Sequence, residues 1–318
     1  MYSRKIIPVI LLLAVIALFP VMTRSEYLLN IMITFFLYVI LSESWNLIGG
    51  FAGQISLGHS AFFGIGALVT RLVWLLGIPI IPALFAGGIG AAVLACSVGI
   101  PCLRMTQAYF PIGTLALAMI AQITIGNIFP LPGSLSSEYV AAYNLSSRYY
   151  LAFAVAIFTV LAVYLLARSK KGLALVAIRD DEGAAAAVGV KPFQHKILAL
   201  LVSSFMAGLG GGIFAYQHVS YFYSAPFELS WAFLPTLTTF IGGLGTISGP
   251  IIGSVAFLAL SELFVLNLGE IHLLVFGATF VLIVMFLPKG LFSLSVGIRS
   301  FLRDWALRLI GRGEAKKL

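Results

Sequence analysis

Long apolar runs alternate with short polar gaps along the whole chain, and this pattern predicts repeated membrane crossing. The hydrocarbon core of a bilayer requires about 20 mostly apolar residues in a helix. Runs of that size lie at 6–23, 27–48, 53–77, 80–101, 105–128, 149–167, 197–219, 230–247, 249–267 and 270–287. The pattern therefore predicts an all-α polytopic membrane protein with about ten transmembrane segments.

Two of these runs, 53–77 and 230–247, are rich in glycine and polar side chains, so we expect a broken or re-entrant helix at either place. The first run follows Arg4 and Lys5, as in a signal peptide. No small-x-small cleavage site follows it, and we interpret it as a retained first helix.

Composition excludes an ordinary soluble domain. The chain is 61% hydrophobic and 9% charged, with a mean hydropathy of +1.08, whereas soluble domains carry roughly a quarter charged residues. The net charge of +8 does not indicate nucleic-acid binding, because no basic run is interleaved with aromatic residues.

The distribution of lysine and arginine predicts the orientation. With a cytoplasmic N-terminus and ten crossings, both termini are cytoplasmic and only Arg24, Arg71 and Arg148 of the 19 basic residues lie outside. This arrangement obeys the positive-inside rule, and the opposite one inverts it. The sequence thus predicts a transmembrane domain over 1–290 and a cytoplasmic basic amphipathic tail over 291–318, lying on the lipid of the inner leaflet.

The gap 168–196 is the longest charged interruption, and within it Asp180, Asp181 and Glu182 precede an alanine run that ends at Gly189. Acidic residues favour a helix N-terminus and glycine favours its end, so we predict a short capped helix here. The residues Arg179 to Glu182 and Gly189 are candidates for transmitting force from a cytoplasmic partner. A structured loop without a partner is equally compatible with the pattern.

Two glycine-rich stretches, 49–60 and 242–250, share a G-G…G-[Q/T]-I-S core at the cytoplasmic ends of their runs. Freed backbone carbonyls at such breaks can line a cavity, and tight helix packing is the alternative interpretation. The candidates for a translocation path are Gly53, Gln54, Ser56, Gly58, His59, Gly242, Gly243, Gly245 and Thr246.

Glu43 and Glu262 lie within apolar runs. An intramembrane carboxylate is costly and normally faces the interior of a helix bundle. Each could line the path, pair with a helix end or contact another subunit.

No catalytic or metal-binding pattern is present. The sequence lacks a nucleotide-binding G-x-x-x-x-G-K-[ST] loop, a G-x-S-x-G elbow and metal-ligand spacing of histidine or cysteine. We expect no enzyme activity, no metal and no cofactor, and we expect any energy for transport to come from another chain.

The segments SWNLIGGFAGQISLGHSAFFGIGA (44–67), AIRDDEGAAAAVGV (177–190), FIGGLGTISGPIIGS (240–254) and LPKGLF (287–292) resemble the branched-chain amino-acid ABC permeases, specifically the LivM-type subunit. This resemblance implies a bacterial inner-membrane complex with a LivH-like second permease, two ABC ATPase subunits and a periplasmic substrate-binding protein. It also implies that 179–189 docks on an ATPase subunit.

The chain departs from the family pattern at Ala121 and Gln122, at 130–137, and in the coupling motif, where Gly183 interrupts the run and Gly189 comes one residue late. The resemblance implies a small-molecule cargo, with branched-chain amino acids first and urea, amides or small aromatic or organic acids as alternatives. An ion-coupled secondary transporter using Glu43 or Glu262, or a membrane scaffold without transport, are the rival functions.

Overall fold

The computed structural model describes residues 3–23, 25–105, 109–268, 277, 285 and 290–291. Apart from those single positions, the predicted segment 270–287 and the predicted tail 291–318 lie outside the described residues.

The other nine predicted runs each correspond to a helix. These are α1 (Ser3–Met22), α2 (Glu26–Asn46), α3 (His59–Leu75), α4 (Ile80–Leu94), α6 (Tyr109–Ile128), α8 (Leu145–Arg168), α11 (Pro192–Gln217), α12 (Leu229–Gly242) and α13 (Ser248–Leu268). Five described stretches are long and apolar enough to span a bilayer, namely Glu26–Phe51, Ile80–Cys102, Tyr109–Ile128, Leu145–Arg168 and Pro192–Gln217. The all-α polytopic class is confirmed, and ten crossings remain a prediction.

In both runs that we expected to be broken, the helix is shorter than the run. Helix α3 starts only at His59, and α12 ends at Gly242. Two helices continue through π-helical turns: η1 (Leu47–Phe51) extends α2, while η2 (Ala95–Gly99) and α5 (Ile100–Cys102) extend α4. Non-helical backbone that contains glycine occupies 52–58, before α3, and 243–247, after α12.

Several short elements connect the long helices. Strands β1 (Pro132–Ser134) and β2 (Ser220–Phe222) pair antiparallel, with Gly133 opposite Tyr221. The remaining elements are α7 (Ser137–Ala141), α9 (Lys170–Asp180), α10 (Glu182–Ala187) and η3 (Ala225–Phe227). Of all these, only α10 was predicted.

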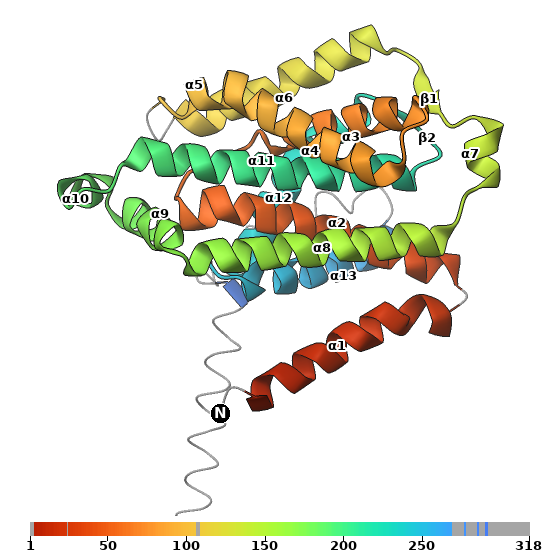
Figure 1. The fold of residues 1–318 in the computed structure, drawn as a ribbon, viewed down its shortest axis with the longest axis horizontal. Helices are drawn as coiled ribbons and strands as arrows, with labels where there is room; N and C mark the ends of the chain where they lie inside the picture. Colours follow the sequence, from red (N-terminus) through yellow and green to blue (C-terminus); the bar gives the residue numbers. More distant parts are fainter. Residues whose placement is uncertain are drawn as a thin grey trace, which may run out of the picture.

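The long helices run side by side, and the short elements gather at their two ends (Figure 1). Helices α9 and α10 lie at one end, here called the α10 end, and β1, β2 and α7 lie at the other, the ribbon end. Helix α11 packs on α3 and α4, and α2 packs on α8, α12 and α13. Helix α1 diverges from this bundle beneath α8 and α13.

Close approach of helix backbones holds α3, α4 and α11 together. Gly66 of α3 faces Gly208 of α11, and a Cβ at Gly66 would overlap the Gly208 backbone. Small residues at such contacts are the usual means of association in membranes, where burial from water cannot drive it.

The outer surface of the bundle is apolar, while its interior holds polar side chains. Ile81, Phe85, Ile89 and Val93 form an exposed stripe along α4. Buried polar residues include Ser42, Glu43, Asn46, Ser56, His59, Ser203, Thr238 and Thr239. This inversion of the soluble pattern is what a lipid environment requires, and the chain is a membrane protein.

Candidate functional site

The two glycine-rich breaks, nearly 200 residues apart in sequence, meet at the α10 end. We call their contact the glycine junction and define it as residues 49–58 together with 242–249. Gly50 packs on Gly245 so closely that a Cβ at Gly50 would lie 2.7 Å from the Gly245 nitrogen. Asn46, just before the first segment, binds the second segment as both acceptor and donor. Its Oδ1 accepts from Gly245 N at 2.9 Å, and its Nδ2 donates to Thr246 O at 2.8 Å.

Arg179, at the end of α9, enters the same junction. Its Nη1 donates to the Gly50 carbonyl oxygen at 3.0 Å, and its guanidinium pairs with Asp180, also at 3.0 Å. A Cβ added at Gly53 would lie 2.8 Å from Arg179 Cγ, and one at Gly245 would lie 2.6 Å from Arg179 Nη1. The absence of side chains at both glycines therefore admits the arginine.

Backbone conformation imposes glycine here as well. Gly53 has φ of 71° and Gly245 has φ of 69°, both in the left-handed region that L side chains rarely adopt. These two positions are restricted to glycine by conformation and by the neighbouring Arg179.

The other predicted path residues lie around this contact. Trp45 Nε1 donates to Ser56 O at 2.6 Å, and His59 Nε2 hydrogen-bonds Ser203 Oγ at 2.9 Å, which places His59 against α11. Gln54 is buried, and its backbone nitrogen donates to Ile48 O at 2.9 Å.

Three of the predicted path glycines lie against neighbouring backbone: Gly58 on the backbone of Thr114, Gly242 on that of Gly249, and Gly243 on that of Gly290. Thr246 Oγ1 donates to Gly243 O at 2.8 Å. The structure thus brings the two predicted segments together but shows them closely packed, and their role in translocation remains a prediction.

The predicted capped helix is confirmed as α10. Asp181 caps it, accepting at Oδ1 from Ala184 N at 2.9 Å, and Gly189 ends it with φ of 91°. The bond from Val190 N to Ala185 O, 3.1 Å, is the contact expected where a glycine terminates a helix. Asp180 instead ends α9, a helix that the sequence did not predict.

Helix α10 is anchored at one end and exposed at the other. Glu182 pairs with Lys196 of α11 at 2.7 Å, and the Lys196 side chain is only 7% exposed. Val188, just beyond α10, is 81% exposed.

Glu43 and Glu262 occupy different surroundings. Glu43 is fully buried, and neither of its oxygens has a hydrogen-bond partner among the described residues. Glu262 accepts from Tyr27 OH at 3.0 Å.

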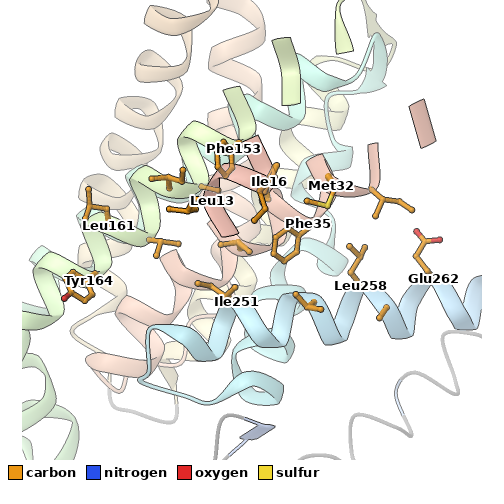
Figure 2. Close-up of a pocket in the computed structure, with 18 residues that line it drawn as sticks. Leu13, Ile16, Met32, Phe35, Phe153, Leu161, Tyr164, Ile251, Leu258 and Glu262 are labelled. Atoms are coloured by element: carbon orange, nitrogen blue, oxygen red, sulfur yellow. The ribbon is translucent and has the colours of Figure 1, made fainter. Parts of the chain in front are cut away.

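Glu262 borders a groove of about 870 Å³ between α1, α2, α8 and α13, lined otherwise by side chains such as Leu13, Phe35, Leu161 and Ile251 (Figure 2). This groove contains no residue of the glycine junction. Within the described part of the chain, no group of three or more His, Cys, Asp or Glu side chains could hold a metal ion.

The sequence does not mark two side chains, Asn46 and Arg71, that connect distant segments at the two ends of the bundle. For Asn46 the usable signal is a polar amide three residues before the pair Gly49-Gly50, near the end of an apolar run. Arg71 was counted only as a charge on the side opposite the other cations. The structure places Arg71 and Arg148 at the ribbon end.

Arg71 is fully buried at the ribbon end and donates to four carbonyl oxygens: those of Ala215 at 3.1 Å, His218 at 3.2 Å, Gly133 at 3.0 Å and Val219 at 2.8 Å. Trp74 and Tyr221 face its guanidinium, with ring centroids 5.8 and 5.2 Å away. Arg71 therefore links the end of α11 to strand β1 and to Val219, the residue that precedes β2.

Comparison with known proteins gives the family. Residues 27–284 match the family model described as "Branched-chain amino acid transport system / permease component". The chain is 24% identical over 292 residues to the LivM permease protein of the high-affinity branched-chain amino acid transport system of Escherichia coli, covering 81% of this chain and 68% of that one.

A second relative is the probable branched-chain amino acid transport permease protein LivM of Methanocaldococcus jannaschii, which is 22% identical over 317 residues, 82% of this chain and 92% of that one. Among solved structures, PsaBC from Streptococcus pneumoniae in complex with Fab aligns with a TM-score of 0.49 at 16% identity, over 87% of this chain and 96% of that one. Since the family model covers most of its length, the chain belongs to the permease components of branched-chain amino acid transport systems.

Proposed function

We propose that this chain is an inner-membrane permease subunit of an ABC importer. It forms a translocation path with a LivH-like second permease, two ATPase subunits supply the energy, and a periplasmic binding protein delivers the cargo. The proposal rests on α10, an exposed and capped helix in a chain of this permease family. Arg179, at the end of the preceding helix, connects α10 to the glycine junction.

The α10 end faces the cytoplasm in this proposal. Arg104, Arg168, Lys170 and Lys171 lie at or near helix ends on this side, together with Arg179, Lys191 and Lys196. The ribbon end carries Arg71 and Arg148. The positive-inside rule therefore supports an N-terminus on the cytoplasmic side, where α1 begins.

The coupling segment, residues 179–189, contacts an ATPase subunit through its exposed face. Val188 and the exposed alanines of α10 (Ala184, Ala186 and Ala187) form a small apolar surface, while the pair of Glu182 with Lys196 holds the helix to α11. A surface that is small, apolar and rigid suits insertion into a groove of a partner, because little conformational entropy is lost on binding.

Branched-chain amino acids are the proposed cargo, because both relatives described above are named for their transport. Urea, other amides and small aromatic or organic acids are the alternatives. Ligand binding by the cognate periplasmic protein, measured by calorimetry with each class in turn, decides among them.

Reconstitution tests the importer. Vesicles containing this chain, the second permease and the ATPase subunits should accumulate radiolabelled leucine only with internal ATP and the external binding protein. Complexes whose ATPase subunits cannot hydrolyse ATP serve as the control. Uptake that proceeds equally with the inactive ATPase would contradict the proposal.

One observation favours testing an ion-coupled transporter alongside it: Glu43 is buried and without a partner among the described residues. That function requires the purified chain alone to take up cargo under a proton gradient, and Glu43→Gln to abolish this uptake. ATP dependence that persists in the Glu43→Gln complex instead supports the importer.

A further inference from the structure

We propose that Arg179 transmits movement of the coupling segment to the glycine junction, and that Arg179 and Asn46 together keep this junction closed. This inference rests on the proposed function, since it requires a partner that moves α10. It names the residues through which that movement reaches the membrane domain.

The connection between α10 and the junction is short. Helix α9 ends at Asp180 and α10 begins at Glu182, so a single extended residue, Asp181, separates them. Arg179 therefore lies one turn or less from the exposed helix. Leu175 and Ile178, on the same helix, are buried, so α9 packs as one rigid helix that includes Arg179, and a shift of α9 would displace Arg179 with it.

Arg179 contacts both halves of the junction at once. Its Nη1 donates to the Gly50 carbonyl at the end of the π-turn that extends α2, and its side chain fills the space beside Gly53 and Gly245. A cation at the C-terminal end of a helix is stabilised by the helix dipole and satisfies a carbonyl that has no partner within the helix. Withdrawing Arg179 would remove this contact and open space between the two segments.

Asn46 makes the second connection. Its side-chain amide pairs with Gly245 N and Thr246 O. Separating Gly50 from Gly245 therefore breaks the two bonds of Asn46 and removes the contact of Arg179 with Gly245. Water at a membrane surface can satisfy the polar groups of these two bonds after opening.

Accessibility of a buried cysteine tests this proposal. Gln54 is 6% exposed and follows Gly53 directly, so Gln54→Cys, with Cys96 and Cys102 replaced by serine, reports opening. The full chain with its second permease, in inside-out vesicles, is treated with a membrane-impermeant thiol reagent. We expect Arg179→Ala and Asn46→Ala each to raise the labelling rate by about tenfold, the factor that corresponds to losing one or two hydrogen bonds.

Two matched variants separate this role from a general loss of structure or charge. Lys171→Ala removes an exposed cation from the same helix and should leave labelling unchanged. Arg179→Lys keeps the charge and should restore part of the protection, because a lysine ammonium can still donate to Gly50 O. Labelling of Arg179→Ala at the wild-type rate would overturn the proposal, as would an equal increase in Lys171→Ala.

Transport gives the second measurement. In the reconstituted complex, Arg179→Ala should still hydrolyse ATP while leucine uptake per ATP falls by about tenfold, in proportion to the lost contact. Unchanged uptake per ATP would also overturn the proposal. If the wild-type complex shows no ATP-dependent uptake, the proposed function fails, whereas the labelling comparison still decides whether Arg179 closes the junction.

Discussion

The two ends of the bundle are each organised by an arginine that donates to backbone carbonyls, but they differ in how firmly the arginine is held. Arg71 at the ribbon end is completely buried, serves four carbonyl oxygens and lies beside two aromatic rings. Arg179 at the α10 end serves one carbonyl, shares its guanidinium with Asp180 and leaves 32% of its side chain exposed.

The end held by Arg179 is the one that can move more easily. Releasing Arg71 would strand several carbonyls and a cation in a buried site, which is costly. Releasing Arg179 exchanges one hydrogen bond for water. If ATP-driven partners act on α10, the contacts near α10 must be able to break while those at the ribbon end persist. The single carbonyl bond of Arg179 and the four carbonyl bonds of Arg71 agree with this requirement.

The largest effect is expected at the ribbon end. Arg71→Ala should lower the free energy of unfolding by on the order of 3–5 kcal/mol, because four buried carbonyl oxygens lose a shared donor and a cavity remains. Thermal unfolding of the purified chain in detergent measures this change. Arg179→Ala, measured in the same way, should cost less than about 1.5 kcal/mol, as one partly exposed hydrogen bond is lost.

Arg71→Lys tests whether the ribbon end requires a guanidinium and not only a positive charge. Lysine keeps the charge but has three donors, whereas the site uses four and selects a planar group between Trp74 and Tyr221. We therefore expect Arg71→Lys to retain only part of the stability. Equal stability of Arg71→Ala and Arg179→Ala would contradict the distinction between the two ends.

The next largest effect is expected at Gly245. Gly245→Ala places a methyl group in the left-handed region and within 2.6 Å of Arg179 Nη1. We expect a loss of about 2–3 kcal/mol in stability, from strain and displaced contacts together, and a loss of coupled uptake.

Gly77→Ala is the matched control for Gly245→Ala. Gly77 also has positive φ, 87°, but a Cβ added there would meet no atom within 4 Å among the described residues. Conformational strain alone should cost about 1–2 kcal/mol there, with uptake preserved. Comparable uptake defects in the two variants would show that strain, rather than contact with Arg179, governs the effect.

Asn46→Ala should have a smaller effect on stability, about 1–2 kcal/mol, because two hydrogen bonds to backbone are lost at a buried position. Asn30→Ala is the control on the same helix, since Asn30 also makes two hydrogen bonds but at the opposite end, with Glu26 O and Gln217. Thermal unfolding should shift similarly in both variants, while only Asn46→Ala should reduce uptake per ATP. A matching uptake defect in Asn30→Ala would remove the special role of the glycine junction.

The sequence specified the helices far better than it specified the site. Apolar runs locate α2, α4 and α8 because a bilayer demands length and hydrophobicity together. Asp181 and Gly189 located α10 because capping is a local property of the backbone. Helix α9 was not predicted because charged residues such as Lys170 and Lys171, between two apolar runs, are also typical of a loop.

The missing parts of the site depend on distant contacts. The repeated glycine motif indicated two related breaks, but nothing local indicates that Gly50 and Gly245 touch. Asn46 acquires its role only through that contact, and Arg179 only through the position of α9. Arg71 likewise depends on carbonyls that lie 62 to 148 residues away in sequence. Such pairings follow from helix packing, which periodicity alone leaves open.

The smallest effect on stability is expected at the cap of α10. A substitution there tests whether the coupling segment must be folded before its partner binds. Asp181→Ala removes the acceptor for Ala184 N, and such a loss typically costs about 1 kcal/mol. Helix α10 has only six residues, so this cost should unfold it locally without changing the thermal unfolding of the bundle. Hydrogen exchange of the amides in 182–188 measures the change, and Asp181→Ser, which retains a capping oxygen, should exchange like the wild type. If Asp181→Ala exchanges faster yet sustains full coupled uptake, partner binding alone orders α10, and the adjustable end of the molecule extends from the glycine junction to the coupling helix itself.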